Sequence, residues 1–326
     1  MALADSLGFR EEVLRSHHAL AVAARTLLLA CLLAPAPLRA QAVSDADLQK
    51  RANAILTLMG FSLTPDVTTG ALSISDQSAG DPYFRQTSIS GGGRVSKSVP
   101  LYLEGTLAYG RYDPTFAAAP GQAAFPVKWD SLLGTGGIGW DFPLARELVL
   151  RPILNFSLGR VESEGTPPAT AQGSSSRDAL DFLDNGRLNA FGLGASLMLD
   201  YERYRPDNEV DVELRYSNIN LQSFDSSTAV EGHANAQSFS LWSRYRAPTG
   251  FSALERPLRY VLEYAYTSFL GDLRGVLGFI DVHSFGAGLE LDSTNYDVYV
   301  TRTRLLVRYK VGNNVTGWAV GLGVSF

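Results

Sequence analysis

Cysteine is almost absent from this sequence. The one cysteine among the 326 residues is Cys31, and it lies in an N-terminal segment that we expect to be removed. A mature chain without cysteine can form no disulfide and no thiolate metal site. Beyond that segment only His233 and His283 remain of the four histidines. The sequence also has no metal-ligand spacing and no phosphate-binding loop, so we expect no metal and no cofactor.

Long apolar runs are also missing. Beyond the N-terminus no uninterrupted apolar stretch approaches the ~20 residues of a membrane-spanning helix, which excludes helical spans there. A formal net charge of −5 argues against nucleic acid as a partner. In contrast, the sequence has 31 Gly, 14 Tyr and 16 Phe. This composition suits a strand-rich protein with aromatic belts and small inward-facing residues.

Residues 1–42 have the order of a secretory signal peptide. Basic residues up to Arg25 precede an apolar core over residues 26–34, and Ala40 and Ala42 flank a small-residue cleavage site. The basic part is longer than such a peptide needs, so translation could start downstream of Met1. A lipoprotein signal ending at Cys31 is the competing interpretation, but too few residues separate Arg25 from Cys31 to form its apolar core. We expect cleavage after Ala42.

One helix is predicted in the mature chain, over residues 44–60. Ser44 can cap its start, Asp47 can return the capping bond, and Gly60 can end it in a left-handed conformation. We therefore divide the chain into a signal peptide (1–42), a helix and linker (43–67) and a barrel domain (68–326). Within a barrel the helix could plug the lumen, with Lys50 and Arg51 meeting acidic lumen side chains.

From residue 68 onward the sequence alternates between large apolar residues and small or charged ones. Leu154, Phe156 and Leu158, for example, alternate with Asn155 and Ser157. A period of two predicts β-strands, and about twelve such strands can be recognised. The sequence thus predicts an all-β fold, an antiparallel up-and-down transmembrane β-barrel of about 12 strands. A soluble β-sandwich is the alternative fold.

The connections between strands support the membrane barrel. Counting back from the C-terminus, every second connection is compact: 292–295, 247–257, 203–208, 143–147 and 96–100. The long connections, 114–126, 162–185, 224–236 and 271–279, fall in the other set. Short periplasmic turns and longer outer loops are typical of outer-membrane barrels. Outward aromatic residues also fall into two sets at opposite strand ends, as expected of two interfacial girdles.

The last stretch, residues 316–326, alternates strictly and ends on an aromatic residue. Large side chains fall on one face, and only Gly, Ala and Ser fall on the other. The stretch resembles the closing strand of bacterial outer-membrane β-barrels, in which this strand is the signal for the barrel-assembly machinery. The resemblance assigns that role to Trp318, Val320, Leu322, Val324 and Phe326.

The barrel of about twelve strands, preceded by the helix over 44–60, resembles the translocator domain of autotransporters. The resemblance covers about residues 44–326 and implies a bacterial, Gram-negative outer-membrane location. It also implies assembly by periplasmic chaperones and the barrel-assembly machinery. Autotransporters carry a long passenger ahead of the barrel, whereas here Val43 leads almost directly into the helix. We therefore expect a solitary autotransporter-like barrel with a structural or surface-binding role, surrounded by outer-membrane lipid.

Two other functions are weighed against that role. A lipid hydrolase could use a Ser–His pair on the barrel wall, and Ser268 and His283 share the outward parity and a similar height. No acidic orienting residue accompanies them, so we expect no enzyme activity. A narrow porin could use charges that face the lumen. These candidate lumen charges are Arg151, Arg215, Arg244, Arg246, Arg259, Arg302, Arg304, Arg308, Glu104, Asp211, Glu213, Glu263 and Glu290.

Overall fold

The computed structural model describes nine stretches: residues 70–74, 83–96, 98–113, 115–116, 125–165, 186–225, 233–275, 278–296 and 300–325. Of the two compact units of the chain, all of these belong to the second, Ala40–Phe326. The predicted signal peptide, the helix over 44–60, the boundary at residue 68 and Phe326 lie outside the described residues. Within them, no helix is long and apolar enough to cross a membrane.

Every regular element that the structure describes is a β-strand. The strands are β1 (Gly70–Ile74), β2 (Tyr83–Arg94), β3 (Leu101–Asp113), β4 (Thr115–Phe116), β5 (Phe125–Trp140), β6 (Phe142–Ala145), β7 (Leu148–Gly165), β8 (Arg187–Tyr204), β9 (Glu209–Phe224), β10 (His233–Ala253), β11 (Arg256–Gly271), β12 (Asp281–Asp292), β13 (Arg302–Gly312) and β14 (Val315–Ser325).

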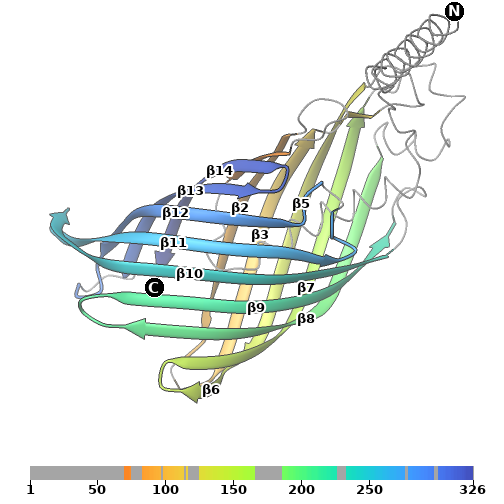
Figure 1. The fold of residues 1–326 in the computed structure, drawn as a ribbon. Coiled ribbons are helices and arrows are strands. Elements are labelled where there is room, and N and C mark those ends of the chain that lie inside the picture. Colours follow the sequence, from red (N-terminus) through yellow and green to blue (C-terminus); the bar gives the residue numbers. More distant parts are fainter. Residues whose placement is uncertain are drawn as a thin grey trace, which may run out of the picture. The chain divides into compact units, whose positions relative to one another are not determined.

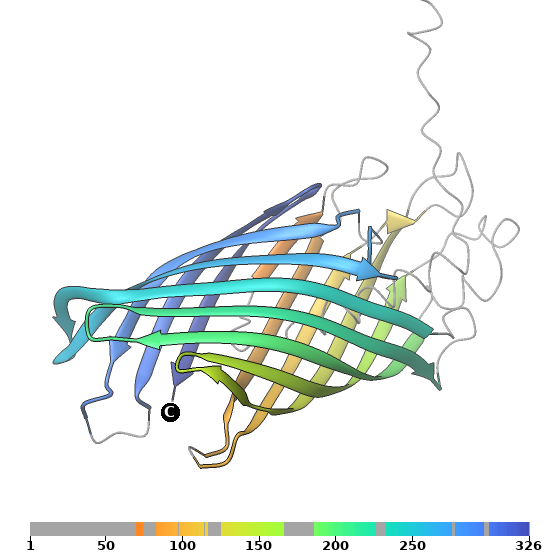
Figure 2. The ribbon, with the colours of Figure 1, turned by 60° about the horizontal axis from the view of Figure 1, so that its bottom comes forward.

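The sheet closes on itself in an up-and-down order. Consecutive long strands pair antiparallel, β5 pairs with β7, and β1 joins β14 to β2. The two short strands, β4 and β6, only flank this ring, which leaves twelve strands in the barrel wall. Figures 1 and 2 show the strands running side by side around the lumen. The predicted all-β barrel of about twelve strands is confirmed.

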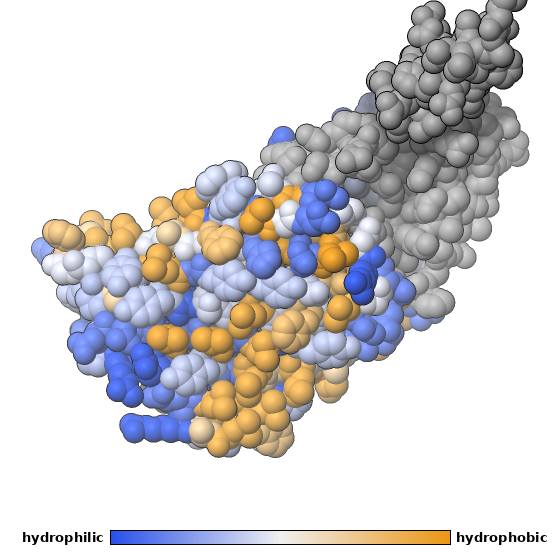
Figure 3. Space-filling view, in the orientation of Figure 1, coloured by the Kyte–Doolittle hydropathy of each residue, from blue (hydrophilic) through white to orange (hydrophobic). Residues whose placement is uncertain are grey.

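Alternation along each strand separates an apolar outer surface from the lumen. On β7, Leu154 is 70% exposed, whereas its neighbours Ile153 and Asn155 are 1% and 3% exposed. Successive side chains of a strand point to opposite faces, so the exposed set forms a belt around the wall. Figure 3 shows part of this belt as a broad patch of hydrophobic residues. An outer belt that is apolar in this way is suited to lipid rather than to water.

Aromatic side chains lie near both ends of the outer surface. Tyr245 and Tyr260 pack together on β10 and β11, with ring centroids 5.9 Å apart. At the other end, Tyr309 and Trp318 pack on β13 and β14 at 4.9 Å. All four are exposed on the outer face. Such pairs are the aromatic girdles that flank the apolar band of a transmembrane barrel.

The connection predicted over 247–257 is shorter than expected. Strand β10 continues to Ala253, and only Leu254 and Glu255 turn the chain back into β11. Both turn residues have positive φ, 50° and 62°, which is the geometry of a type I′ hairpin. A register shift between Pro248 and Ser252 breaks the alternation there. Because of this bulge, the alternation of the sequence did not indicate where the strand ends.

Candidate functional site in the barrel lumen

The predicted lumen charges lie on the inward face of the wall. All of them are buried except Arg302 and Glu213, which keep part of their surface. Four further acidic residues join them that the predicted set omitted: Asp141, Asp200, Glu209 and Asp292. Each has inward parity, so alternation could have found all four. Glu209 and Asp292 stand at strand ends, where the predicted strands stopped.

Opposite charges face each other directly across neighbouring strands. Asp211 on β9 stands opposite Arg244 on β10, which in turn stands opposite Glu263 on β11. Glu290 on β12 stands between Arg259 on β11 and Arg304 on β13. Directly opposed residues of an antiparallel pair have close Cβ atoms, so opposite charges there attract. The register of the strands thus places most buried charges next to a charge of the opposite sign.

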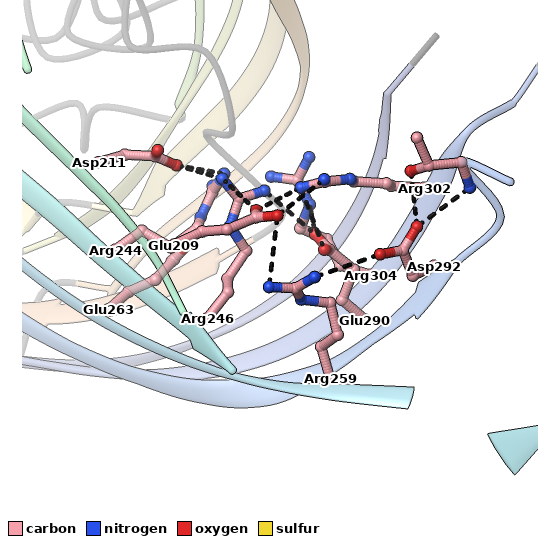
Figure 4. A network of polar contacts seen from close by, with 11 residues as sticks. Glu209, Asp211, Arg244, Arg246, Arg259, Glu263, Glu290, Asp292, Arg302 and Arg304 are labelled. Atoms are coloured by element: carbon pink, nitrogen blue, oxygen red, sulfur yellow. Dashed lines mark hydrogen bonds and ion pairs between the residues drawn. The ribbon is translucent and has the colours of Figure 1, made fainter. Parts of the chain in front are cut away.

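Glu209 connects strands that are not neighbours. Its two carboxylate oxygens accept hydrogen bonds from Arg302 at 2.5 and 3.0 Å, although β9 and β13 are separated by three strands. Arg246 and Arg259 reach the same carboxylate at 3.2 and 3.3 Å. Figure 4 shows these side chains converging on one another. We call this group, completed by Asp211, Glu290, Asp292 and Arg304, the ionic layer.

A second long-range pair crosses the middle of the barrel wall's inward face. Arg215 on β9 donates two hydrogen bonds to Glu104 on β3, at 2.9 and 2.6 Å. Asn155 donates to the same carboxylate, and the Ser196 hydroxyl donates to the Asn155 side chain. The Arg215–Glu104 pair also spans three intervening strands. A bidentate arginine–carboxylate pair is the strongest arrangement of this kind, so it fixes the distance across the lumen.

A glycine makes room for the Glu104 side chain. Gly137 on β5 lies between β3 and β7, and a Cβ there would stand 2.6 Å from Glu104 Cγ and 2.9 Å from Asn155 Nδ2. Glu104 therefore lies across β5 at an inward position that has no side chain.

Arg151 forms a third charged group, on the β7–β8 side. It pairs with Asp141 at 2.5 Å and with Asp200 at 3.0 Å. Its guanidinium lies 3.9 Å from the centroid of the Tyr102 ring. The two carboxylates compensate the charge of the buried arginine, and the aromatic ring packs against the flat face of its guanidinium group. These contacts hold the Arg151 side chain in one position.

The outer end of the lumen is filled by apolar side chains instead. Phe84, Tyr112 and Trp129 stand on successive strands and are at most 2% exposed. Neighbouring rings pack in a tilted arrangement, with centroids 6.5 and 5.9 Å apart. The indole of Trp129 donates to Ser163 at 3.0 Å. The lumen thus has an apolar end at these rings and a charged end at the ionic layer. The Glu104–Arg215 pair lies between the two ends, and the Glu209–Arg302 pair lies in the ionic layer.

The candidate serine and histidine lie on the neighbouring strands β11 and β12. His283 stands opposite Tyr266, and its Nδ1 is hydrogen-bonded to the Tyr264 hydroxyl at 3.0 Å. Ser268 stands opposite Asp281, two register pairs further along. The side chains that contact His283 are those of Tyr264 and Tyr266. Among the residues whose placement is described, no group of histidines, cysteines or acids could hold a metal ion.

The closing strand presents its large side chains to the outside. Trp318, Val320, Leu322 and Val324 are 62%, 54%, 72% and 47% exposed. Ala319, which has the opposite parity, is 2% exposed. Four of the five residues expected to signal assembly thus form one continuous lipid-facing row, and the fifth, Phe326, lies outside the described residues.

An apolar outer belt, two aromatic girdles and a polar lumen define the chain as a transmembrane β-barrel of the outer-membrane type. Among solved structures it is similar to the transport unit of the autotransporter AIDA-I from Escherichia coli, at 11% identity and a TM-score of 0.50. That match covers 87% of this chain and 100% of the other. The fold is therefore that of an autotransporter-like barrel.

Two further translocator barrels resemble it more distantly. The translocator domain of NalP from Neisseria meningitidis has 11% identity and a TM-score of 0.46, covering 86% of this chain and 97% of that one. The β domain of the Bordetella autotransporter BrkA has 15% identity and a TM-score of 0.44, covering 79% and 98%. No protein-family profile and no curated relative matches the sequence.

Proposed function

We propose that this protein is a closed outer-membrane barrel that acts as a structural or surface-binding scaffold and conducts little by itself. The observation that carries the proposal is the pair of ion bridges across the lumen, Glu104–Arg215 and Glu209–Arg302. Each spans three strands, and the two stand at different levels of β9. A barrel of about twelve strands has a narrow interior that side chains can fill.

A free polar path along the lumen would need mobile or outward-turned charges. Here eight arginines of the predicted set are matched by nearby carboxylates, and both long-range bridges are bidentate. Holding these charges in fixed pairs inside the wall leaves few groups to attract a passing ion. The predicted helix over 44–60 would be a second barrier, and assembly by periplasmic chaperones and the barrel-assembly machinery belongs to the same proposal.

Single-channel conductance of the purified protein in planar bilayers tests the closed barrel. We expect small or no conductance in the wild type, and openings in a Glu104→Gln, Glu209→Gln double variant, because both bridges are then broken. The matched control is Glu162→Gln, since Glu162 is an exposed carboxylate paired with Arg160. High conductance in the wild type would instead establish a porin.

Deleting residues 43–62 separates the helix from the side chains as barriers. If the bridges close the lumen, the deletion leaves conductance low while the double variant conducts. If the deletion alone opens a large pore, the helix is the barrier and the bridges are only structural. If the protein hydrolyses lipid and the His283→Ala substitution abolishes that hydrolysis, the protein is an enzyme and not a scaffold.

A further inference from the structure

The outer ends of β9 and β10 reverse the polarity of the apolar belt. Their inward residues are apolar and buried, among them Ile219, Leu221 and Ala236. Their outward residues carry side-chain amides, and we call these five residues the amide patch: Asn218, Asn220, Gln222, Asn235 and Gln237. The outward face of a transmembrane barrel is apolar only along the hydrocarbon layer. The amide patch therefore lies just beyond that layer, at the level of the lipid headgroups.

The register of the strands joins the amides into one surface. Asn220 on β9 stands directly opposite Asn235 on β10, and Asn218 stands opposite Gln237. Figure 1 shows β9 and β10 running side by side. Directly opposed side chains on one face of an antiparallel pair are close neighbours. The amide groups of the two strands can therefore contact one ligand together.

Aromatic rings border the amide patch on two sides. Toward the apolar belt, the next outward pair is Tyr216 and Phe239. Toward the strand ends, Phe191 on β8 stands opposite Gln222 and packs against Phe224, with ring centroids 6.2 Å apart. Phe191 and Phe224 are 37% and 43% exposed. The face of an aromatic ring is negative, so it packs well against the weakly positive C–H groups on the face of a sugar ring.

The side chains of the amide patch are available for binding. None of them makes a side-chain hydrogen bond with any residue that the structure describes. Asn220 and Gln222 are exposed. The side-chain oxygens of Asn218 and Asn235 are covered and accept no hydrogen bond, and rotation about the soft terminal torsion brings each to the surface. Because an amide both donates and accepts, the matching partner is one that does both, such as a hydroxyl-rich molecule.

The amide patch has no ionisable side chain, in contrast to the outer ends of β3, β5, β7 and β8. One outward row across those four strands consists of Arg111, Asp130, Glu162 and Arg187. Asp272 and His233 border the amide patch: the Asp272 carboxylate accepts a hydrogen bond from the Asn235 backbone N–H at 2.8 Å, and His233 stands opposite Gln222. An ionised ligand would lose water here without gaining an ion pair from the amides. The patch thus favours an uncharged ligand.

We propose that the amide patch binds the uncharged sugar headgroup of a glycolipid in the outer leaflet. The amides donate to and accept from the sugar hydroxyls, and Phe191 packs against the face of a sugar ring. The lipid-facing pair Tyr216 and Phe239 lies directly beside the patch, so the acyl chains hold a lipid-borne sugar at this level and raise its effective concentration. The inference rests on the surface-binding part of the proposed function and is independent of whether the lumen conducts.

A single labelled cysteine can report on the lipid beside the amide patch. In a Cys31→Ser background, Leu193→Cys opposite Asn220 carries a bimane label, and Leu132→Cys, exposed on β5, is the control position. The probes are digalactosyl diacylglycerol and phosphatidylcholine with the same brominated acyl chains, which quench bimane, in vesicles at equal mole fractions. We expect the digalactosyl lipid to quench at least about threefold more strongly at position 193 and equally at position 132, since one net hydrogen bond is enough for that ratio.

The decisive variant is Asn220→Leu with Asn235→Leu, which removes one opposed amide pair and breaks no side-chain hydrogen bond among the described residues. We expect the preference for the digalactosyl lipid at position 193 to fall to about one. The matched control is Glu164→Leu, because Glu164 is an exposed outward residue near the outer end of β7. Heat-modifiable mobility on a gel reports that each variant still forms a barrel. An equal preference in the double variant overturns the proposal, and so does the absence of any preference before the amides are changed.

Two further measurements distinguish other occupants. Free digalactose at the concentration of the glycolipid should leave the preference unchanged, and competition by the free sugar would assign the amide patch to a soluble glycan instead. Disulfide-linked dimers of unlabelled Leu193→Cys, without dimers of Leu132→Cys, would assign it to a second copy of this chain. Either result overturns the glycolipid. High conductance with the lipid preference intact would refute the closed lumen alone, so failures of the two proposals are recognised separately.

Discussion

The Arg215 guanidinium on β9 donates two hydrogen bonds to the Glu104 carboxylate on β3, at 2.9 and 2.6 Å. The two residues are 111 positions apart in the sequence, and three strands of the wall separate them. Their side chains are 4% and 1% exposed. A pair this deeply enclosed ties opposite parts of the barrel to each other, so its loss affects both stability and the width of the lumen.

Breaking this bridge should destabilise the barrel strongly. We expect Arg215→Met to lower the free energy of unfolding by about 3–5 kcal/mol, because it leaves the Glu104 carboxylate buried without its main partner. Denaturant unfolding in detergent or lipid vesicles, followed by tryptophan fluorescence, measures the change. Replacing both residues, as Arg215→Met with Glu104→Leu, should recover most of the loss.

The matched control for the bridge is an exposed ion pair. Arg160 and Glu162 on β7 have side chains that are 52% and 58% exposed. Exposed pairs contribute little, so Arg160→Met should change the free energy of unfolding by no more than about 0.5 kcal/mol. A loss in Arg160→Met equal to that in Arg215→Met would show that burial is not what makes the Glu104 bridge important.

The space at Gly137 can be tested with one methyl group. In Gly137→Ala the new Cβ would stand 2.6 Å from Glu104 Cγ, so Glu104 must move away from Arg215. We expect a loss of about 1–3 kcal/mol in the free energy of unfolding. Gly91→Ala is the control, because a Cβ at Gly91 meets nothing within 4 Å. Equal effects of the two substitutions would contradict the close packing of Glu104.

The apolar belt predicts how an arginine is tolerated at two strongly exposed leucines. Leu154 lies in the middle of β7 and is 70% exposed, and Leu254 lies at the tip of the β10–β11 hairpin and is 83% exposed. We expect Leu154→Arg to destabilise the barrel in lipid by about 2–4 kcal/mol, because it places a charge in the hydrocarbon layer. Leu254→Arg should cost about 0–1 kcal/mol, as near an interface. Urea titration in lipid vesicles compares the two, and similar costs would refute the placement of the belt.

The closing strand predicts an assembly defect and not only a loss of stability. Deleting Phe326 should leave protein unassembled in the periplasm, since the resemblance to closing strands of outer-membrane barrels assigns Phe326 to the assembly signal together with Trp318 and Leu322. Phe326→Tyr keeps an aromatic end and should assemble normally. Heat-modifiable mobility of membrane fractions distinguishes folded from unfolded protein, and wild-type insertion of the deletion variant would disprove the role.

The sequence by itself determined which face of the wall each residue occupies. Side chains of a strand alternate with a period of two whatever the strand pairs with, so Leu154 and Leu322 could be assigned to the lipid and Glu104 and Arg215 to the lumen. The same local rule predicted a barrel of about twelve strands. It lost accuracy only where a bulge interrupted the period, at Pro248, and where strands ended, at Glu209 and Asp292.

Only the tertiary structure decided which inward charges meet. Alternation states that Arg302, Glu209 and Lys310 all face the lumen, but it does not state their height or their neighbours. Those depend on the stagger between strands and on the curvature of the closed sheet, which are properties of the whole ring. Hence Arg302 reaches Glu209 across three strands, and Glu104 lies over Gly137.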